Sequence, residues 1–443
     1  MDLSLAALNS CAGAGGVGEQ TSIGGHHLAF RCNGIFMKES CSRREERFYE
    51  RLKPVQEYVL RYVNYFARLY ASEEDEDTEF GSNNVTEGED VRQPCTTAPA
   101  SSIAHKEDVS ASCPKVSCDH CKAGGMCAML WRCLPLTHQR VSTKSVDAGA
   151  CGTCDTKDIK TDDVCRENEC PLFHGVQMDE EEVPLAAGRR DWEFLVRLAP
   201  FVPRYHGLFV VQLNRADGGT PTPKRILRCA TSPLVTDTSS GDERPPYQGG
   251  SPLADDASSR QMIVLEDICS GFKHPCVLDM KMGRRQYGLN PSEAKRRSKE
   301  HKAACTTTKQ YGVRLAGMRR WCPDKQQYET RSKLAGRLLS LEELQDTVFR
   351  FMQRSQSIRQ GFRRLIKRLR RAFVQRHIYR FFTSSLLFVY DADEPLESSR
   401  VVMVDFAFTY DRDELQLGGD PDAGQDEDLG YINALETVLQ MLS

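Results

Sequence analysis

Two long stretches of this 443-residue chain lack the hydrophobic periodicity that a packed core requires. Residues 73–185 are rich in acidic residues, serine, threonine and cysteine, and residues 73–90 alone carry nine Asp or Glu and no Lys or Arg. Residues 230–260 form a second stretch of this kind. Periodic sequence resumes after each of them, so we predict a disordered insertion at 73–185 and a flexible loop at 230–260.

Patterns typical of strands and helices flank these stretches. Residues 22–38 contain a glycine pair and alternating apolar positions, which predict a strand, a turn and a strand ending in a lysine. Ser42 and Glu45 have the spacing of a capping box at the start of a helix, and Pro54 is expected to break or kink that helix. The apolar run 208–213 predicts a further strand.

A basic amphipathic helix and a hairpin are predicted in the C-terminal half. Residues 359–376 carry eight Lys or Arg and no acid. Apolar residues recur there at helical spacing, namely Phe362, Leu365, Ile366, Leu369 and Phe373. We expect their face to be buried, although nuclear localisation signals and membrane-surface helices share this pattern. Residues 385–391 and 401–408 follow as two strands of a hairpin.

Cysteine content and hydropathy favour a reducing, aqueous compartment. Disulfide scaffolds are short chains in which cysteine takes a larger share than 18 residues in 443. The N-terminal segment has no basic stretch ahead of an apolar one, and no run approaches the roughly 18 apolar residues of a transmembrane helix. We therefore expect a cytoplasmic or nuclear protein without a transmembrane segment.

The most informative segment is PCVLDMKMG at residues 275–283. It predicts an apolar strand that presents Asp279 and Lys281 on one face, because side chains two residues apart along a strand point the same way. A surface ion pair would have the same spacing. The weight of this motif therefore depends on the segments that accompany it in order.

In that order the sequence resembles a known family. The pattern P-x-x-x-D-x-K-x-G is the hallmark of the inositol polyphosphate kinases, and its fixed positions are filled by Pro275, Asp279, Lys281 and Gly283. Upstream, SIGGHHLAFRC, GIFMK and REERFYERL resemble segments of the hexakisphosphate kinases of that family. Downstream, YGVRLAGM, KLAGRLLS, RFFTSSLLFVYD, VDFAFTY and GYINALE do so in the same order. The resemblance covers residues 21–70, about 190–229 and 261–443.

The resemblance implies a two-lobed, protein-kinase-like α+β fold with ATP bound between the lobes. An N-terminal tail at 1–20 would precede the first lobe. That lobe would comprise residues 21–72 and 186–267, interrupted by the insertion at 73–185 and containing the loop at 230–260. The second lobe would comprise residues 268–443 and hold the inositol phosphate pocket.

The resemblance also implies roles for individual residues, with ATP and Mg²⁺ as cofactors. Lys38 would bind the ATP phosphates, the backbone around Glu266 the adenine, and Asp279 the ribose. Asp405 would hold Mg²⁺ against the nucleotide phosphates, and Lys281 would contact the transferred or acceptor phosphate. The expected ATP ligands are Lys38, Glu266, Asp267, Ile268, Asp279 and Asp405, and the expected catalytic residues are Lys281 and Asp405.

Cations concentrate just after the motif, where the family shapes its inositol pocket. Six phosphates on one ring carry about nine or more negative charges, and arginine and lysine side chains suit such a ligand. Without the motif we would favour a solvated helix or a nucleic-acid surface; with it, we expect an inositol phosphate substrate and no nucleic acid. The expected substrate ligands are Pro275, Asp279, Lys281, Gly283, Arg284, Arg285, Lys295, Arg296 and Lys302.

Two alternatives to a hexakisphosphate kinase stay open. The residue after Asp-Phe-Ala is usually histidine in hexakisphosphate kinases and often lysine in multikinases, but here it is Phe408. A multikinase that phosphorylates ring hydroxyls of lower inositol phosphates is therefore the second interpretation. A non-catalytic inositol phosphate sensor is the third, and the presence of Lys38 and Asp405 argues against it. The sequence does not indicate the ring position or the oligomeric state.

The insertion contains two C-x-x-C pairs, Cys118 with Cys121 and Cys151 with Cys154. Such pairs can hold zinc. The gap of roughly 30 residues between them is longer than in common zinc ribbons, and apolar periodicity is low. Free reduced cysteines are the preferred interpretation over a zinc site.

Overall fold

The computed structural model describes residues 28–62, 189–214, 222–228, 259–375 and 377–443. The predicted N-terminal tail, the insertion at 73–185 with its C-x-x-C pairs, and most of the loop at 230–260 lie outside these ranges. The last two residues of that predicted loop belong to a strand instead, which begins at Ser259.

The first sheet has five antiparallel strands in the order β1-β2-β5-β3-β4. They are β1 (Ala29–Cys32), β2 (Ile35–Glu39), β5 (Ser259–Glu266), β3 (Tyr205–Asn214) and β4 (Thr222–Arg228). Asn33 and Gly34 connect β1 to β2 with φ of 47° and 82°, as expected for Asn-Gly in a two-residue hairpin turn. The predicted strand, turn and strand are thus confirmed from residue 28 onward, with β2 ending at Glu39, one residue after the predicted lysine, whereas residues 22–27 lie outside the described ranges. The run 208–213 lies within β3.

Helix α2 (Arg43–Arg61) follows this hairpin and differs from the prediction in two ways. It continues past Pro54, because Val55 and Val59 pack in the core beyond that residue. Its N-cap Ser42 accepts a hydrogen bond from the Glu45 amide. The Glu45 carboxylate, however, is bound by Lys38, so only half of the capping box forms.

The second sheet has the strand order β11-β10-β6-β7-β8, also antiparallel throughout. Its strands are β6 (Pro275–Met282), β7 (Val313–Cys322), β8 (Gln327–Arg331), β10 (Ser385–Asp391) and β11 (Arg400–Val404), and a small pair joins β9 (Arg380–Phe381) to β12 (Thr409–Tyr410). The predicted hairpin corresponds to β10 and β11. Its second strand ends at Val404 instead of residue 408, because Asp405 has a φ of 68°, which no strand accommodates.

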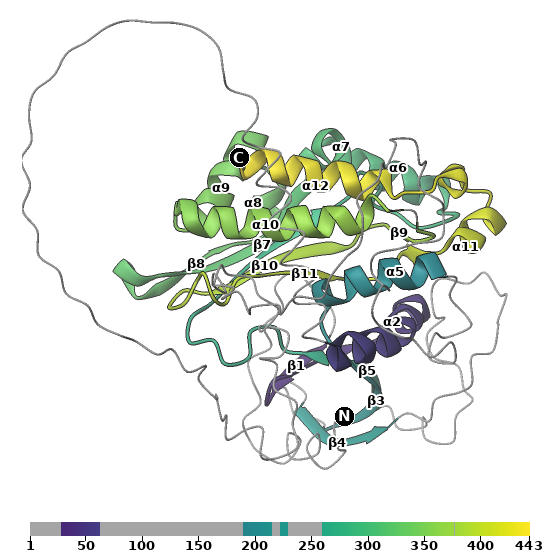
Figure 1. Ribbon diagram of the computed structural model, residues 1–443, viewed down its shortest axis with the longest axis horizontal. Coiled ribbons are helices and arrows are strands. Elements are labelled where there is room, and N and C mark those ends of the chain that lie inside the picture. The colour runs from purple at the N-terminus through teal and green to yellow at the C-terminus, as the bar shows by residue number, and fades with distance from the viewer. Residues whose placement is uncertain (1–27, 63–188, 215–221, 229–258, 376) are drawn as a thin grey trace, which may run out of the picture.

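Helices cover one face of the second sheet (Figure 1). The remaining elements are α5 (Arg189–Leu198), α6 (Glu293–Ala304), α7 (Thr307–Tyr311), α8 (Lys333–Arg337), α9 (Leu341–Phe351), α10 (Gln356–Phe373), α11 (Arg412–Leu417), α12 (Leu429–Met441) and the 3₁₀ turns η4 (Ala199–Phe201), η5 (Pro323–Lys325) and η6 (Pro421–Gly424). The two sheets and their helices confirm an α+β fold. No helix of the described residues is long and apolar enough to span a bilayer.

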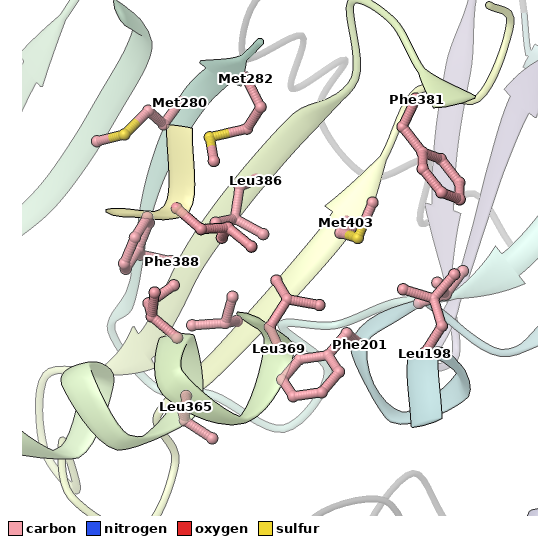
Figure 2. Packing of buried hydrophobic residues seen from close by; sticks show 14 of the residues in the cluster. Leu198, Phe201, Met280, Met282, Leu365, Leu369, Phe381, Leu386, Phe388 and Met403 are labelled. Atoms are coloured by element: carbon pink, nitrogen blue, oxygen red, sulfur yellow. The ribbon is translucent and has the colours of Figure 1, made fainter. Parts of the chain in front are cut away.

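The core lies between α10 and this sheet face. Figure 2 shows Leu365 and Leu369 of α10 near Leu386 and Phe388 of β10. All five predicted apolar residues of α10 are buried, which confirms the amphipathic helix with a buried face. Each such side chain stabilises the fold by about 1.5–3 kcal/mol relative to an exposed one. Helix α5 joins this core by packing against α2 and α10.

A buried ion pair links the two sheets. Arg400, at the start of β11, donates hydrogen bonds of 2.7 Å and 3.4 Å to the carboxylate of Glu266, at the end of β5. Burial alone would raise the pKa of Glu266, but the Arg400 guanidinium outweighs it and the pKa lies below its usual value. The pair therefore stabilises the fold at neutral pH and loses this effect as the pH falls through the lowered pKa.

We predict that Arg400→Met lowers the free energy of unfolding by about 3–5 kcal/mol, because it leaves the Glu266 carboxylate buried without a cationic partner, with only the Arg204 amide donating to it. Urea denaturation at pH 7 measures this. The double variant Glu266→Gln/Arg400→Met should recover most of the loss. Arg297→Met, which breaks the exposed pair with Glu293, should cost less than about 0.5 kcal/mol. Equal losses for Arg400→Met and Arg297→Met would contradict this interpretation.

Candidate active site

The second sheet has two chemically different faces. Leu278 and Met280 of β6 point into the core, whereas Val277, Asp279 and Lys281 alternate with them and lie on the opposite face. The register places Lys281 beside Ser385 of β10. The predicted shared face of Asp279 and Lys281 is thus observed in β6.

Three predicted residues converge at one end of that face. The Lys281 Nζ lies 2.6 Å from Oδ2 of Asp405, and the Lys38 Nζ lies 3.6 Å from Oδ1 of the same carboxylate. Lys38 comes from β2 of the first sheet and Lys281 from β6 of the second. Desolvation works against ionisation of Asp405, but the two ammonium groups hold its pKa well below the usual value. The carboxylate is thus negative at any physiological pH.

Glu45 is a member of this cluster that the sequence analysis assigned only to a helix cap. Its Oε1 accepts a 2.7 Å hydrogen bond from Lys38 Nζ and one of 3.2 Å from the backbone amide of Phe406. Burial would lower the pKa of Lys38, but Glu45 and then Asp405 raise it to about 12. The available signal was an acid seven residues after the strand-ending lysine, in the first turn of the next helix.

Strained backbone surrounds Lys281. Asp405 and Thr383 have φ of 68° and 58°, and this left-handed region is unfavourable for a β-branched residue such as threonine. The Thr383 carbonyl accepts a 2.9 Å hydrogen bond from Lys281 Nζ. Both strained residues therefore contact the same ammonium group, and such strain is concentrated at functional sites.

Asp279 lies beside the cluster, and one of its carboxyl oxygens lacks a hydrogen-bond partner among the described residues. Burial raises the pKa of its carboxyl group and the negative charge of Asp405 adds to this, while Lys281 opposes the shift. Its Oδ1 is buried and has no hydrogen-bond partner among the described residues. Buried polar atoms are rarely left unpaired, so this oxygen is suited to bind a ligand group such as a sugar hydroxyl.

In the segment predicted to bind adenine, residues 266–268, both carboxylates accept hydrogen bonds from other groups of the protein. Glu266 is bound by Arg400, and Asp267 accepts a hydrogen bond from the Cys269 amide. The backbone amide of Asp267 donates to the carbonyl of Gly34. Ile268 lies in an apolar cluster on the site face, together with Cys269, Val277, Val389 and Val402. This cluster could accommodate a flat apolar ring, while specific contacts would have to come from the backbone.

The cations predicted to bind the substrate lie in two places, just after β6 and on α6. Arg285 is held by Asp420 and Asp422, at 2.7 Å and 3.4 Å, and its guanidinium stacks on Phe382. Arg284 is exposed and donates to the carbonyl of Gln310. The second group, Lys295, Arg296 and Lys302, is exposed on α6. Arg285 therefore supports the surrounding loops in this structure, and its predicted role in substrate binding is untested.

The end residues of the motif shape the strand. Pro275 opens β6, opposite Asp391 of β10. Gly283 follows the strand with a φ of 80°, a conformation that glycine adopts without a steric penalty, and its carbonyl accepts a hydrogen bond from Gln286. Phe408 is half-buried in a small cluster with Tyr410. These residues position the site, and neither Pro275 nor Gly283 offers a charged group.

Four further cations lie at this site that the predicted set did not include. Lys299, Arg314 and Lys333 lie near Lys281, and Arg337 lies near Arg314 and Lys333. Arg314 is the direct cross-strand partner of Lys281, and its buried Nη1 has no hydrogen-bond partner among the described residues. None of the four forms an ion pair within the described ranges. Burial and then neighbouring cations lower the pKa of both Lys299 and Lys333. Unpaired like charges at close range are destabilising, so this set is suited to an anionic ligand.

The C-terminal part of the chain, which contains most of the site, is similar to known proteins. Residues 262–443 match the profile of the family described as inositol polyphosphate kinase. The second sheet and its helices are therefore similar to that family. The match includes Asp279, Lys281 and Asp405 but begins after Lys38 and Glu45, so the expected resemblance is confirmed for the second sheet and its helices.

Relatives in this family are similar over part of their length. An uncharacterized inositol polyphosphate kinase of Schizosaccharomyces pombe is 35% identical over 202 residues, which are 40% of this chain and 21% of that protein. Human inositol hexakisphosphate kinase 3 is 36% identical over 141 residues, 31% of this chain and 34% of the relative. Mouse inositol hexakisphosphate kinase 3 is 30% identical over 206 residues, 41% and 50% of the two chains. The chain thus spans between a fifth and a half of these relatives.

A solved structure is also similar to part of the chain. The inositol phosphate multikinase Ipk2 of Saccharomyces cerevisiae, in complex with ADP and Mn²⁺, is 23% identical. The superposition covers 41% of this chain and 83% of the multikinase, with a TM-score of 0.36.

We predict that Glu45→Gln lowers the pKa of Lys38 from about 12, because the loss of one carboxylate weakens the attraction that outweighs burial. A ¹³C NMR titration of the labelled lysine ε-carbon measures this. Glu57→Gln is the matched control, since Glu57 lies on the same helix and is exposed. An unchanged Lys38 pKa in Glu45→Gln would contradict the assigned contact.

Proposed function

We propose that this chain is an ATP-dependent inositol hexakisphosphate kinase that transfers the γ-phosphoryl group of ATP to a ring phosphate and forms diphosphoinositol pentakisphosphate. The observation that carries the proposal is the convergence of Lys38 and Lys281 on Asp405, beside a set of cations without ion-pair partners. The match of residues 262–443 to the inositol polyphosphate kinase family supports a phosphotransferase that acts on inositol phosphates.

The donor set at Asp405 fits a divalent metal ion. Mg²⁺ prefers oxygen ligands and often binds through one or two carboxylates together with substrate phosphates and water. Asp405 is ionised, and 46% of its side-chain surface is accessible. When bound, Mg²⁺ would neutralise charge that develops on the phosphate oxygens of the nucleotide. Asp405 is the residue that would hold it, and the cofactors of the proposed reaction are ATP and Mg²⁺.

The side chains of the site supply positioning and positive charge. Lys38 would bind the phosphates of ATP, and Glu45 keeps its ammonium group protonated and fixed. Lys281, held by the Thr383 carbonyl, would lie between the transferred phosphoryl group and the acceptor. The unpaired Oδ1 of Asp279 would accept a hydrogen bond from a ribose hydroxyl. Such preorganised charge is often the largest contribution to phosphoryl transfer.

The chemistry of the acceptor favours a phosphate over a hydroxyl. A ring phosphate is already ionised near neutral pH, so its attack on ATP requires no general base, whereas a ring hydroxyl must lose a proton. The residues that converge on Asp405 are lysines, which are charged and act as cationic ligands. Lys299, Arg314, Lys333 and Arg337 add the positive charge that a densely phosphorylated ring requires.

We predict that the purified chain consumes ATP with inositol hexakisphosphate and yields a diphosphate-bearing product. Asp405→Asn should reduce turnover by about a hundredfold or more, and asparagine tolerates the positive φ of this position. Asp413→Asn, an exposed acid on α11, should leave turnover unchanged. Product identification by NMR and mass spectrometry provides the measurement.

Inositol trisphosphate is assayed in parallel to distinguish the alternatives. Faster turnover of the trisphosphate, with hydroxyl phosphorylation, would assign the chain to the multikinases. Ligand binding without ATP consumption by the wild-type chain would identify a sensor and contradict the proposed catalysis.

We also predict that Lys299→Gln and Lys333→Gln each raise the KM for inositol hexakisphosphate by about tenfold, because each removes a charge-assisted hydrogen bond to phosphate. The KM for ATP should change less than twofold or so. Lys325→Gln, at an exposed lysine of η5, is the matched control. Equal effects on the two KM values would argue against a role of these lysines in acceptor binding.

A further inference from the structure

Two leucines are exposed on one side of helix α8, Leu334 within the helix and Leu338 at its C-cap, where the backbone is still helical. Leu334 is 70% and Leu338 85% exposed, and with Leu417 they are the most exposed large apolar side chains of the described residues. A single exposed leucine needs no explanation. These two, however, are four residues apart, so they lie next to each other on the helix surface.

Gly336 fixes the direction in which these leucines point. A Cβ atom at Gly336 would lie 2.4 Å from the carbonyl oxygen of Leu315, so the backbone of α8 lies directly against β7 at this residue. At 3.6 residues per turn, Leu334 and Leu338 are each about 160° around the helix from Gly336. Their side chains therefore point away from the second sheet.

Cations lie along one flank of the same helix. By the same helical geometry, Lys333 and Arg337 fall about 60° and 100° from Gly336 on the same side. That side adjoins Arg314, whose charge lowers the pKa of Lys333 after the larger effect of burial. The nearest acids in sequence are Glu329, which is bound by Arg320 and Arg350, and Glu342 and Glu343 in the first turn of α9, of which Glu343 is bound to the Ser340 amide. The apolar pair is thus bordered by positive charge.

The contrast with α10 is informative, because the sequence pattern suggested that helix for a membrane surface. Its apolar side chains are buried between α5, α12 and the second sheet, so they are unavailable to lipid while the fold is intact. The leucines at α8, in contrast, point into solvent. Short amphipathic segments with outward leucines and flanking cations bind at the boundary between headgroups and acyl chains.

We propose that α8 is a docking surface for a membrane with anionic headgroups, in which Leu334 and Leu338 enter the acyl boundary while the positive charge of Lys333 and Arg337 attracts the anionic surface. The charge pattern favours a bilayer over a protein partner. Two leucines provide far less than the roughly 800 Å² per partner of a stable protein interface, whereas each nearby cation adds attraction to an anionic surface. Because Lys333 and Arg337 also belong to the proposed acceptor site, the test changes only the leucines and is carried out without inositol phosphate.

The test is co-sedimentation of the full chain with vesicles of phosphatidylcholine, with or without phosphatidylserine. The wild-type chain should bind the anionic vesicles preferentially, and added salt should weaken binding. Leu334→Ser/Leu338→Ser should lower the bound fraction about fivefold or more, because it removes the apolar contact. Leu417→Ser is the matched control, since Leu417 is 86% exposed on α11, and it should bind like the wild type. Circular dichroism verifies that both variants are folded.

Two outcomes would overturn the proposal. One is a wild-type chain that shows no preference for anionic vesicles, and the other is a Leu334→Ser/Leu338→Ser variant that binds them as well as the wild type does. Light scattering adds a third, since self-association that disappears in this variant, without vesicle binding, would assign the leucines to a contact between protein chains. Because turnover is measured separately, failure of docking and failure of the proposed kinase activity are distinguishable.

Discussion

The structure depends on one carboxylate that binds ammonium groups from two different sheets. Asp405 lies at the end of the second sheet and contacts Lys281 of that sheet and Lys38 of the first. The first helix reinforces this link, because Glu45 accepts hydrogen bonds from Lys38 and from the Phe406 amide. The buried pair of Arg400 and Glu266 joins the sheets at a second point. These contacts fix the distance between the two sheets at the site.

The charges near this carboxylate are only partly balanced. Asp405 and Glu45 balance Lys38 and Lys281. The carboxyl group of Asp279 lies near Arg314 and Lys333, but Lys299, Arg314, Lys333 and Arg337 have no ion-pair partner within the described residues. A chain that holds unpaired cations together loses stability through their repulsion, and this loss is reversed when a polyanion binds. The strained backbone at Thr383 and Asp405 also costs stability, and the surrounding fold maintains it in a geometry that suits a ligand.

Local patterns were sufficient to predict much of the second sheet and its helices. The alternation of Val277, Asp279 and Lys281 defines a strand face, and the apolar spacing from Phe362 to Phe373 defines the buried side of α10. Contacts between distant segments were not predictable in this way. The capping-box spacing of Glu45 gave no indication that Lys38 would take its carboxylate, and Arg314 meets Lys281 only through strand register. Pro54 did not end α2, because burial of Val55 and Val59 favours a continuous helix.

The most direct test of this account is a double-mutant cycle on single-turnover rates of phosphoryl transfer to inositol hexakisphosphate. The variants are Lys281→Met, Asp405→Asn and their combination. If the two side chains act as one unit, the double variant should be only about as slow as the slower single variant, because groups that function together have strongly non-additive effects. Losses that multiply in the double variant, or a Lys281→Met variant as fast as the wild type, would contradict a catalytic centre built on this ion pair.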